Sequence, residues 1–212
     1  MIALRITVPI ACWRKGHARE YWETEILPPP ATCYGALLSL VGETDRETHI
    51  GVRITAGLLN RPTLSTVLRT FWRVKKKELS QGSAENARPD LQQLWCNAEL
   101  MIWCDNGDDK ADEKLEQRVT MALKNPEKIY RFGGWSLGES THLINDAWLI
   151  DTAPSPESTC HAFLLDSNGN LTFPVWVDHV GMSGTNYVVG SMENINSTPS
   201  VERIPKIEPA AT

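Results

Sequence analysis

Residues 27–43, LPPPATCYGALLSLVGE, decide the local fold of the N-terminal half. Three successive prolines exclude a helix before Pro30, because each fixes φ and lacks an N–H donor. Behind Thr32, a predicted N-cap, apolar residues recur at helical spacing as far as Val41, and Gly42 occupies the C′ position. The stretch therefore predicts a rigid turn that leads into a short, buried helix from Thr32 to Val41.

The order of the remaining elements predicts the fold class. Hydrophobic periodicity predicts strands at 2–10, 51–59, 65–77, 98–104 and 147–150, and a second helix at 110–124. Two strand–helix–strand halves around an inserted hairpin favour an α+β fold with a ferredoxin-like or RRM-like βαββαβ sheet. In such a sheet the helices cover one face and leave the other face free for a ligand.

Domain organisation follows from the same order. We expect one ferredoxin-like domain at 1–151, with an inserted hairpin at about 65–97. Residues 152–192 are predicted to extend this domain by a hairpin of strands 162–165 and 171–177, joined across a Ser-Asn-Gly-Asn turn. The segment 193–212 is rich in Pro, Ser and Asn, which predicts a flexible tail.

Composition excludes several classes of protein. The five cysteines are widely spaced without a CxxC pair, which indicates free thiols in a reducing cytoplasm and neither a disulfide framework nor a zinc site. No apolar run approaches the ~18 residues that a membrane span needs. We therefore expect a cytoplasmic protein that needs no metal, cofactor or membrane.

Charge is divided unevenly along the chain. The first 77 residues hold 12 Lys and Arg against 6 Asp and Glu, and the remainder holds 9 against 20. Cations fix phosphates and flat rings stack on splayed bases, so a basic and aromatic set predicts single-stranded RNA binding. In the first loop and the third strand that set comprises Arg14, Lys15, His17, Arg19, Tyr21, Trp22, Arg69, Trp72, Arg73, Lys75, Lys76 and Lys77. The alternatives are a core role for Trp72 and a solvated strand end for the three lysines.

A glycine-rich loop at 132–139, FGGWSLGE, is the second candidate site. Glycine lets a backbone approach a phosphate or base closely, although the loop also fits a simple tight turn. Its G-x-S-x-G pattern allows a serine hydrolase with Ser136 as nucleophile. The predicted helix before the loop argues against that reading, because a nucleophile elbow needs a strand before the serine and a helix after it.

A metal-free ribonuclease is another alternative. RNA cleavage of that kind needs a general base, an acid and a cation beside the phosphorane. Tyr34, His17 and His142 with nearby Lys or Arg are the candidates, but no triplet is close in the sequence.

Several segments, in order, resemble the fifth CRISPR-associated protein family, in its compact DevS-like branch. They are TVPIACWRKGHAREYWET, LPPPATCYGALLSLVGE, VLRTFWRVKKK, ENARPD and FGGWSLGES, within about residues 1–150. The family is the RAMP subunit of the type I Cascade complex that caps the 5′ handle of the CRISPR RNA (crRNA). The resemblance implies a RAMP core that grips the handle and a β-hairpin thumb that crosses the RNA.

The resemblance also assigns roles to residues. The thumb would be 65–97, with Arg69, Arg73 and Lys75–Lys77 on its stem and Asn86 and Arg88 at its tip. The first loop and Tyr34 would hold handle nucleotides. The glycine-rich region would approach the RNA backbone through Arg131, Gly133, Gly134, Trp135 and Ser136.

The implied partners are the crRNA 5′ handle, the large Cascade subunit and the first backbone subunit, with target DNA engaged indirectly. One branch of the family cleaves repeat RNA with a Tyr, Lys and His set. Tyr34 is present here without a convincing Lys–His pair, so we expect a non-catalytic RNA-binding subunit.

Overall fold

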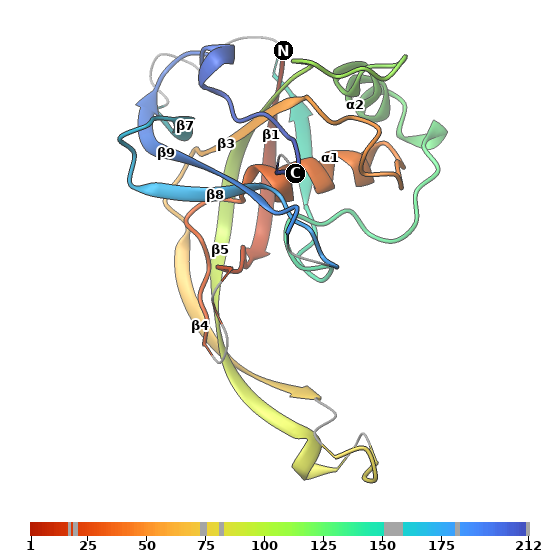
Figure 1. The fold of residues 1–212 in the computed structure, drawn as a ribbon, viewed down its shortest axis with the longest axis vertical. Helices are drawn as coiled ribbons and strands as arrows, with labels where there is room; N and C mark the ends of the chain where they lie inside the picture. The colour runs from red at the N-terminus through yellow and green to blue at the C-terminus, as the bar shows by residue number, and fades with distance from the viewer. Residues whose placement is uncertain are drawn as a thin grey trace.

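The computed structural model describes residues 1–16, 18, 21–72, 76–80, 83–150, 159–180 and 183–210, without the side chains of Phe71 and Trp72. Within those residues the chain forms two α-helices and one sheet of nine strands (Figure 1). The strands are β1 (Ile2–Ala11), β2 (Tyr21–Trp22), β3 (Arg53–Leu58), β4 (Thr63–Trp72), β5 (Ala87–Asp105), β6 (Asp146–Leu149), β7 (Cys160–Leu165), β8 (Leu171–Trp176) and β9 (Asn186–Ile195). The helices are α1 (Pro30–Leu40) and α2 (Leu115–Lys124), with short 3₁₀ turns at Ala84–Asn86, Pro126–Lys128 and Val201–Arg203. No helix in this described part of the chain is long and apolar enough to cross a membrane.

The centre of the sheet has the strand order β6-β1-β5-β3, and each neighbouring pair is antiparallel. α1 connects β1 to β3, and α2 connects β5 to β6. Alternate residues of β1, such as Leu4 and Ile6, are fully buried beneath the helices, as their period-two spacing predicts. The predicted strands and helices of this region are therefore present in the expected order.

The first helix begins two residues earlier than the sequence predicts. Pro29 occupies the N-cap position and Pro30 the first helical position, so the prediction that Thr32 is the N-cap is wrong. Proline is favourable there because its φ suits the helix and its missing N–H would have no partner. The predicted end is correct: Gly42 has φ of 71°, its N–H donates to Ser39, and the next N–H donates to Leu38.

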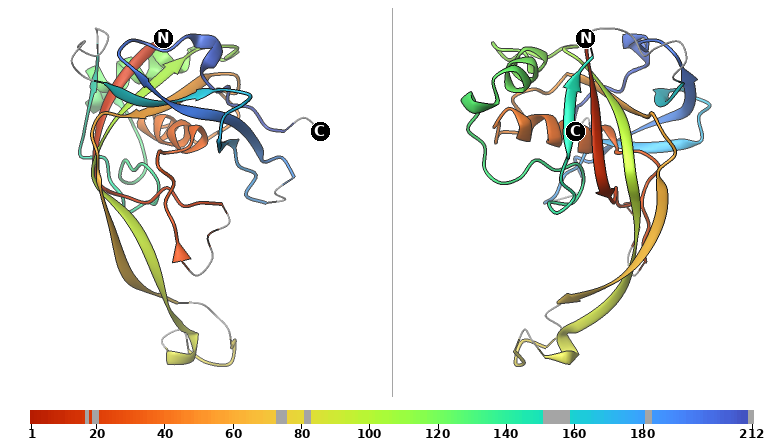
Figure 2. Two further views of the ribbon diagram at one scale, coloured as in Figure 1. Left: turned by 90° about the vertical axis from the view of Figure 1, so that its left-hand side faces the viewer. Right: turned by 180° about the vertical axis from the view of Figure 1, so that it is seen from behind.

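α1 is buried on more than the side that faces the sheet. β8 and β9 curl away from the central strands and cover a second side of α1 (Figure 2). The ring of Tyr34 on α1 lies 6.4 Å from the ring of Trp176 at the end of β8. A helix that is enclosed in this way needs apolar residues on most of its surface, which explains the composition of PATCYGALLSL.

The second helix is shorter than predicted. It begins at Leu115 rather than at residue 110, and residues 110–114 form a turn before it. Asp109 still satisfies the helix start, because its Oδ2 accepts the Leu115 N–H at 3.1 Å. The side of α2 that carries Leu115, Val119 and Ala122 joins the main core with α1.

An arm extends from the body, made of β4, residues 87–96 of β5 and the connecting segment (Figures 1 and 2). The antiparallel ladder runs from the Thr63–Cys96 pair at the body to the Trp72–Ala87 pair near the tip. The arm corresponds to the inserted hairpin predicted at about 65–97. Near its tip, Ala84–Asn86 forms a 3₁₀ turn and β5 begins at Ala87.

The C-terminal region differs from the prediction in its pairing. β7 and β8 do not pair with each other as the predicted hairpin requires; β9 lies between them and pairs with both. The flexible tail predicted from residue 193 is also wrong for the segment that follows β9. Ile204 and Ile207 are fully buried, and the Ile54 N–H donates to Pro205.

This segment also covers the sheet face that the sequence predicts to be free. Met101 and Trp103 point to that face, are at most 2% exposed, and cluster with Ile204. The two isoleucines in a Pro- and Ser-rich sequence give no periodic signal, so composition alone predicted disorder. This part of the sheet face is closed, and a ligand site must lie elsewhere.

Candidate nucleic-acid interface

The first loop lies beside the arm because β2 pairs in parallel with β5. Tyr21 is opposite Leu91 and Trp22 is opposite Gln92 in this short ladder. Tyr21 is 41% exposed, and its hydroxyl accepts a hydrogen bond from Gln93 at 3.0 Å. The pairing thus brings the predicted loop residues and the predicted arm residues together.

Arg14 and Lys15, the basic residues of the first loop that the structure describes, already have partners. The Arg14 guanidinium lies 4.3 Å from the centre of the Trp22 ring and donates to the Ala18 carbonyl. Lys15 Nζ is 3.7 Å from the Glu23 carboxylate, and both of these side chains are almost half exposed. Arg14 and Trp22 therefore stabilise the loop, and Lys15 remains accessible to solvent.

A polar junction joins the first loop, the arm and the glycine-rich loop at Glu139. Its two carboxylate oxygens accept from Arg69 at 2.9 Å and from Gln92 at 2.7 Å, two residues from different strands that share one face of the arm. His142 lies 3.8 Å from the same carboxylate, and its Nδ1 accepts the Cys12 N–H at 3.2 Å. Burial lowers the pKa of His142, which keeps this nitrogen an acceptor. We call these five residues the Glu139 junction.

The glycine-rich loop packs against the first loop through Gly138. This residue has φ of 114°, and a Cβ there would lie 2.9 Å from the Cys12 carbonyl oxygen. Trp135 is half-buried and donates from Nε1 to the Ala36 carbonyl of α1 at 2.9 Å. Gly133 and Gly134 are exposed, and an added Cβ at Gly133 would meet no atom within 4 Å. The loop therefore has a packed end at 135–138 and an open end at 131–134.

The open end carries two aromatic side chains that the sequence analysis missed. Tyr130 and Phe132 are 91% and 96% exposed, and they flank the exposed Arg131. An aromatic–Arg–aromatic triplet beside two glycines was the available signal in the sequence. Exposed rings beside a cation are typical of surfaces that stack on bases.

The structure contradicts the nucleophile elbow at Ser136. Residues 129–135 form no strand, and residues 137–145 form turns rather than a helix. Ser136 instead makes a β-bridge with Leu143. The loop lacks the strand–turn–helix geometry that exposes a nucleophilic serine.

Tyr34 is a buried residue of α1, with 3% of its surface exposed. Its hydroxyl donates to the Arg46 carbonyl at 2.7 Å, and burial raises its pKa. A tyrosine in this state is a poor general base. His142, another ribonuclease candidate, is also buried and accepts a backbone N–H.

The predicted residues of the outer stem and the tip of the arm have different environments. Lys76 and Lys77 are exposed, and Lys76 forms an ion pair with Glu85. Asn86 is buried and holds the tip together by hydrogen bonds to the Lys76 backbone and the Ser80 carbonyl. Arg88 Nε lies 3.0 Å from the Asp90 carboxylate.

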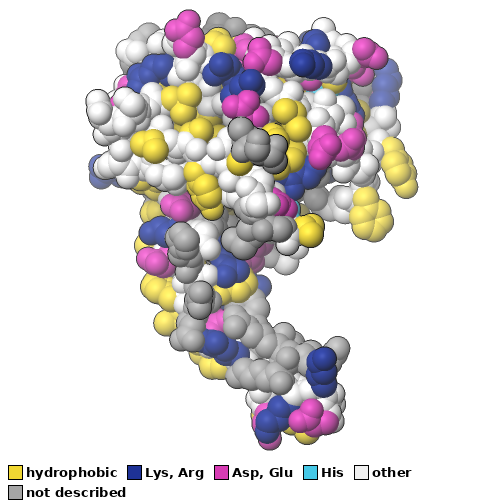
Figure 3. Space-filling view, viewed as in Figure 1, with side chains coloured by type: hydrophobic (Ala, Val, Ile, Leu, Met, Phe, Trp, Pro, Cys, Tyr) yellow, Lys and Arg dark blue, Asp and Glu magenta, His cyan; other side chains and the backbone are white. Residues whose placement is uncertain are grey.

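Other predicted residues lie outside the described part of the structure: His17, Arg19, Arg73, Lys75 and the side chain of Trp72. On the face seen in Figure 3, basic and acidic side chains are interspersed over the body and the arm rather than gathered into one basic surface.

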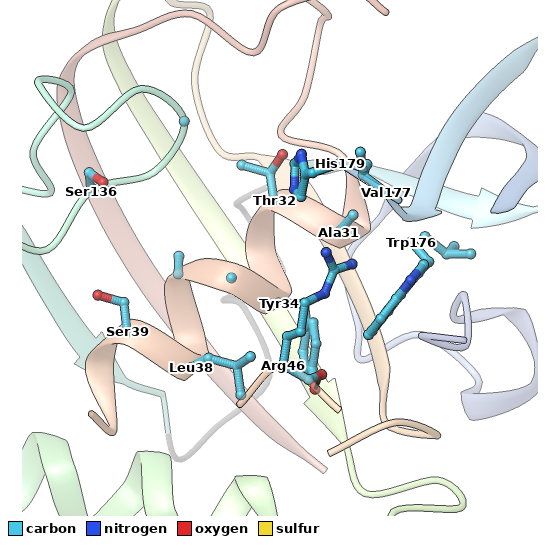
Figure 4. Close-up of a pocket in the computed structure, with 14 residues that line it drawn as sticks. Ala31, Thr32, Tyr34, Leu38, Ser39, Arg46, Ser136, Trp176, Val177 and His179 are labelled. Atoms are coloured by element: carbon cyan, nitrogen blue, oxygen red, sulfur yellow. Dashed lines mark hydrogen bonds between the residues drawn. The ribbon is translucent and has the colours of Figure 1, made fainter. Parts of the chain in front are cut away.

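Two adjoining pockets lie beside the glycine-rich loop. The larger, about 730 Å³, lies between the first loop, Gly138–Glu139 and β8–β9. The second, about 490 Å³, lies between α1 and β8 (Figure 4). The two pockets form a continuous groove, because four residues line both of them. The shared residues are Thr32, Gly138, Val177 and His179.

The groove contains residues that sequence reasoning missed. Arg46 lies over the ring of Trp176, with its guanidinium carbon 3.9 Å from the ring centre. His179 and Tyr187 are exposed along the β8–β9 side. Arg46 belongs to a charged turn and the others to the C-terminal region, so no local pattern linked them.

Similarity to known proteins extends over almost the whole chain. No family model matches it. A CRISPR-associated protein Cas5 from Myxococcus xanthus (strain DK1622) is 59% identical over 208 residues, which cover 98% of this chain and 97% of that protein. The chain belongs to the Cas5 family. The family predicted from the sequence is thus confirmed.

Solved structures share the fold of this Cas5-family chain. A chain of a CRISPR RNA-guided surveillance complex has a TM-score of 0.63 at 9% identity, and the match covers 92% of this chain and 89% of that one. A chain described as the crystal structure of a Cas protein has a TM-score of 0.58 at 13% identity, with 97% of both chains covered. The mixed α/β architecture with its large antiparallel sheet is therefore one found among Cas proteins.

Proposed function

We propose that this chain is a non-catalytic subunit of a type I Cascade complex that binds and caps the 5′ handle of the crRNA. In this proposal the central strands and two helices are the RAMP ferredoxin-like core, and the arm is the thumb that crosses the RNA. The large subunit and the first backbone subunit are the protein partners, and target DNA is engaged indirectly.

The observation that carries the proposal is the Glu139 junction. Three segments that the sequence singled out for RNA, far apart along the chain, meet there through Cys12, Arg69 and Glu139 itself. The continuous groove begins beside this junction, since Glu139 lines the larger pocket together with Lys15. Membership of the Cas5 family and the fold shared with a surveillance-complex chain support the same proposal.

The environment of Tyr34 argues against a catalytic role for this residue. A tyrosine that acts as base must lose its proton near neutral pH, and burial moves the pKa of Tyr34 in the opposite direction. Its hydroxyl is also occupied by the Arg46 carbonyl.

The test is to recover the tagged chain from its native host and to sequence the RNA that accompanies it. We expect guide RNAs that share one 5′ end, together with other Cascade proteins. Recovery without nucleic acid, with fluorophosphonate labelling at Ser136, would overturn the proposal in favour of a hydrolase.

Catalysis is tested separately with purified chain and repeat RNA in the absence of metal. We expect intact RNA after incubation. Cleavage at one site that Tyr34→Phe abolishes would instead establish the endoribonuclease.

A further inference from the structure

The pocket between α1 and β8 combines an apolar floor with a polar rim. Its floor includes Gly35, Ala36 and Val175, and its rim includes Thr32, Ser136 and His179. The floor is apolar, whereas the rim offers two hydroxyl groups and an imidazole. A volume of about 490 Å³ is within the range of small-molecule sites.

Gly35 lies in the interior of α1, where glycine destabilises a helix relative to alanine. Neither backbone geometry nor crowding explains it: its φ is not positive, and an added Cβ would meet no atom within 4 Å. Gly57 on β3 is different, because a Cβ there would lie 2.5 Å from Cys160 Sγ. The missing side chain of Gly35 leaves open space over the helix.

Arg46 supplies a fixed cation beside that space. Figure 4 shows Arg46 extending past Tyr34 toward Ala31, with its guanidinium beside Trp176. The Tyr34 hydroxyl bond to the Arg46 carbonyl fixes the backbone from which this side chain extends. The guanidinium makes no hydrogen bond or ion pair with any other described residue, so its N–H groups remain available to an anion.

We infer that this pocket takes one nucleotide of the bound RNA, with the base over Gly35 and a phosphate on Arg46. A flat base fits the apolar floor, and its polar edge can meet the hydroxyls and imidazole of the rim. The pocket continues into the cleft lined by Lys15, so the chain on either side of this nucleotide has a path past the Glu139 junction. The inference rests on the proposed function and adds a single defined base site to it.

The experiment measures binding of repeat-derived RNAs to the full chain by fluorescence anisotropy. One RNA is intact, and each of the others carries one abasic nucleotide at a successive position of the handle. For wild type, one abasic position should weaken binding about tenfold, the size expected for one stacked base. Gly35→Leu should weaken intact RNA by a similar factor and should abolish the difference at that position, because its side chain fills the base site.

Thermal unfolding of the Gly35 variants separates an effect on binding from an effect on folding. Gly35→Ala and Gly35→Leu should unfold at temperatures no lower than wild type, since both residues favour the helix and enter open space.

The role of Arg46 is tested by a second pair of variants. Arg46→Gln should weaken the binding of intact RNA about tenfold, because a charge-assisted contact is lost. Arg61→Gln, at an exposed arginine, is the matched control and should leave RNA affinity unchanged.

Three results would count against the inference. If wild type binds no repeat RNA, the proposed function fails with it. If RNA binds but Gly35→Leu and the abasic series have no coupled effect, only the base site fails. If Gly35→Leu leaves RNA affinity unchanged but prevents co-purification of other Cascade proteins, the pocket takes a protein side chain instead.

Discussion

The two halves of β5 show how one strand serves two different regions. Residues 98–104 lie between β1 and β3 in the body, and Leu100 there is fully buried. Residues 87–96 pair with β4 in the arm, where Leu91 is 46% exposed. The backbone ladder is continuous, so the halves differ in burial rather than in secondary structure. The body is fixed by its core, and the arm by its ladder and its junction with the body.

The two faces of the arm differ as well. Leu64, Leu68 and Leu91 share one face and are 46–69% exposed. The opposite face carries Arg69 and Gln92, which bond to Glu139 of the body. The polar face therefore anchors the arm, and the apolar face remains uncovered in the described structure.

The largest effect should separate the two halves by the same substitution. Leu100→Ala should lower the free energy of unfolding by about 2–5 kcal/mol, because it leaves a cavity in the core. Leu91→Ala should cost less than about 1 kcal/mol, since its side chain is half exposed. Urea denaturation of both variants measures this, and equal losses would show that the arm is part of the same packed core.

The second prediction concerns RNA binding by the arm. Replacing Arg73, Lys75, Lys76 and Lys77 by Ala, with the anchoring Arg69 left in place, should weaken RNA binding at least about tenfold at low salt. It should also flatten the salt dependence, because each phosphate contact to a single strand contributes about 0.7 to the logarithmic slope. Filter binding across a salt series measures both quantities. A slope equal to that of wild type would exclude these residues as phosphate contacts.

The third prediction uses the pH dependence of the Glu139 junction. The folded pKa of His142 is lowered from 6.5, chiefly by burial, although Glu139 acts in the opposite direction and Arg69 adds to the lowering. The unfolded chain therefore binds the proton more readily, so His142 stabilises the fold above about pH 6.5 and this stability is lost as pH falls toward the folded pKa. His142→Asn should remove that part of the acid sensitivity, as measured by unfolding at pH 7.5 and 5.5. Identical pH profiles for both proteins would contradict the prediction.

The smallest effect should come from Glu139→Gln. Removing the charge should loosen the attachment of Arg69 and should cost about 1 kcal/mol locally. Hydrogen exchange should then rise in residues 87–96 and remain unchanged in 98–104. Glu85→Gln, at the exposed ion pair with Lys76, is the matched control and should change neither half. Faster exchange in both halves would show that the junction also supports the core.

The sequence determined those features whose cause is local. The prolines before α1 and Gly42 after it fix the ends of the helix through φ and the missing N–H, which any fold must respect. The alternation of β1 and the order of the central elements followed from periodicity in the same way. The arm and the glycine-rich loop could also be recognised in the sequence, because an unusual content of charged residues or glycine is a local feature that does not depend on contacts with distant residues.

Only the tertiary structure decided how distant surfaces are covered. The insertion of β9 between β7 and β8, and the burial of Ile204 and Ile207, depend on which sheet edge and face remain open after the centre is assembled. Tyr34 lies in a segment that suggested an RNA contact, yet β8 covers its ring and its hydroxyl donates to the Arg46 carbonyl. The joining of Cys12, Arg69 and Glu139 and the placing of Arg46 over Trp176 arise from the same long-range packing, for which a local pattern carries no signal.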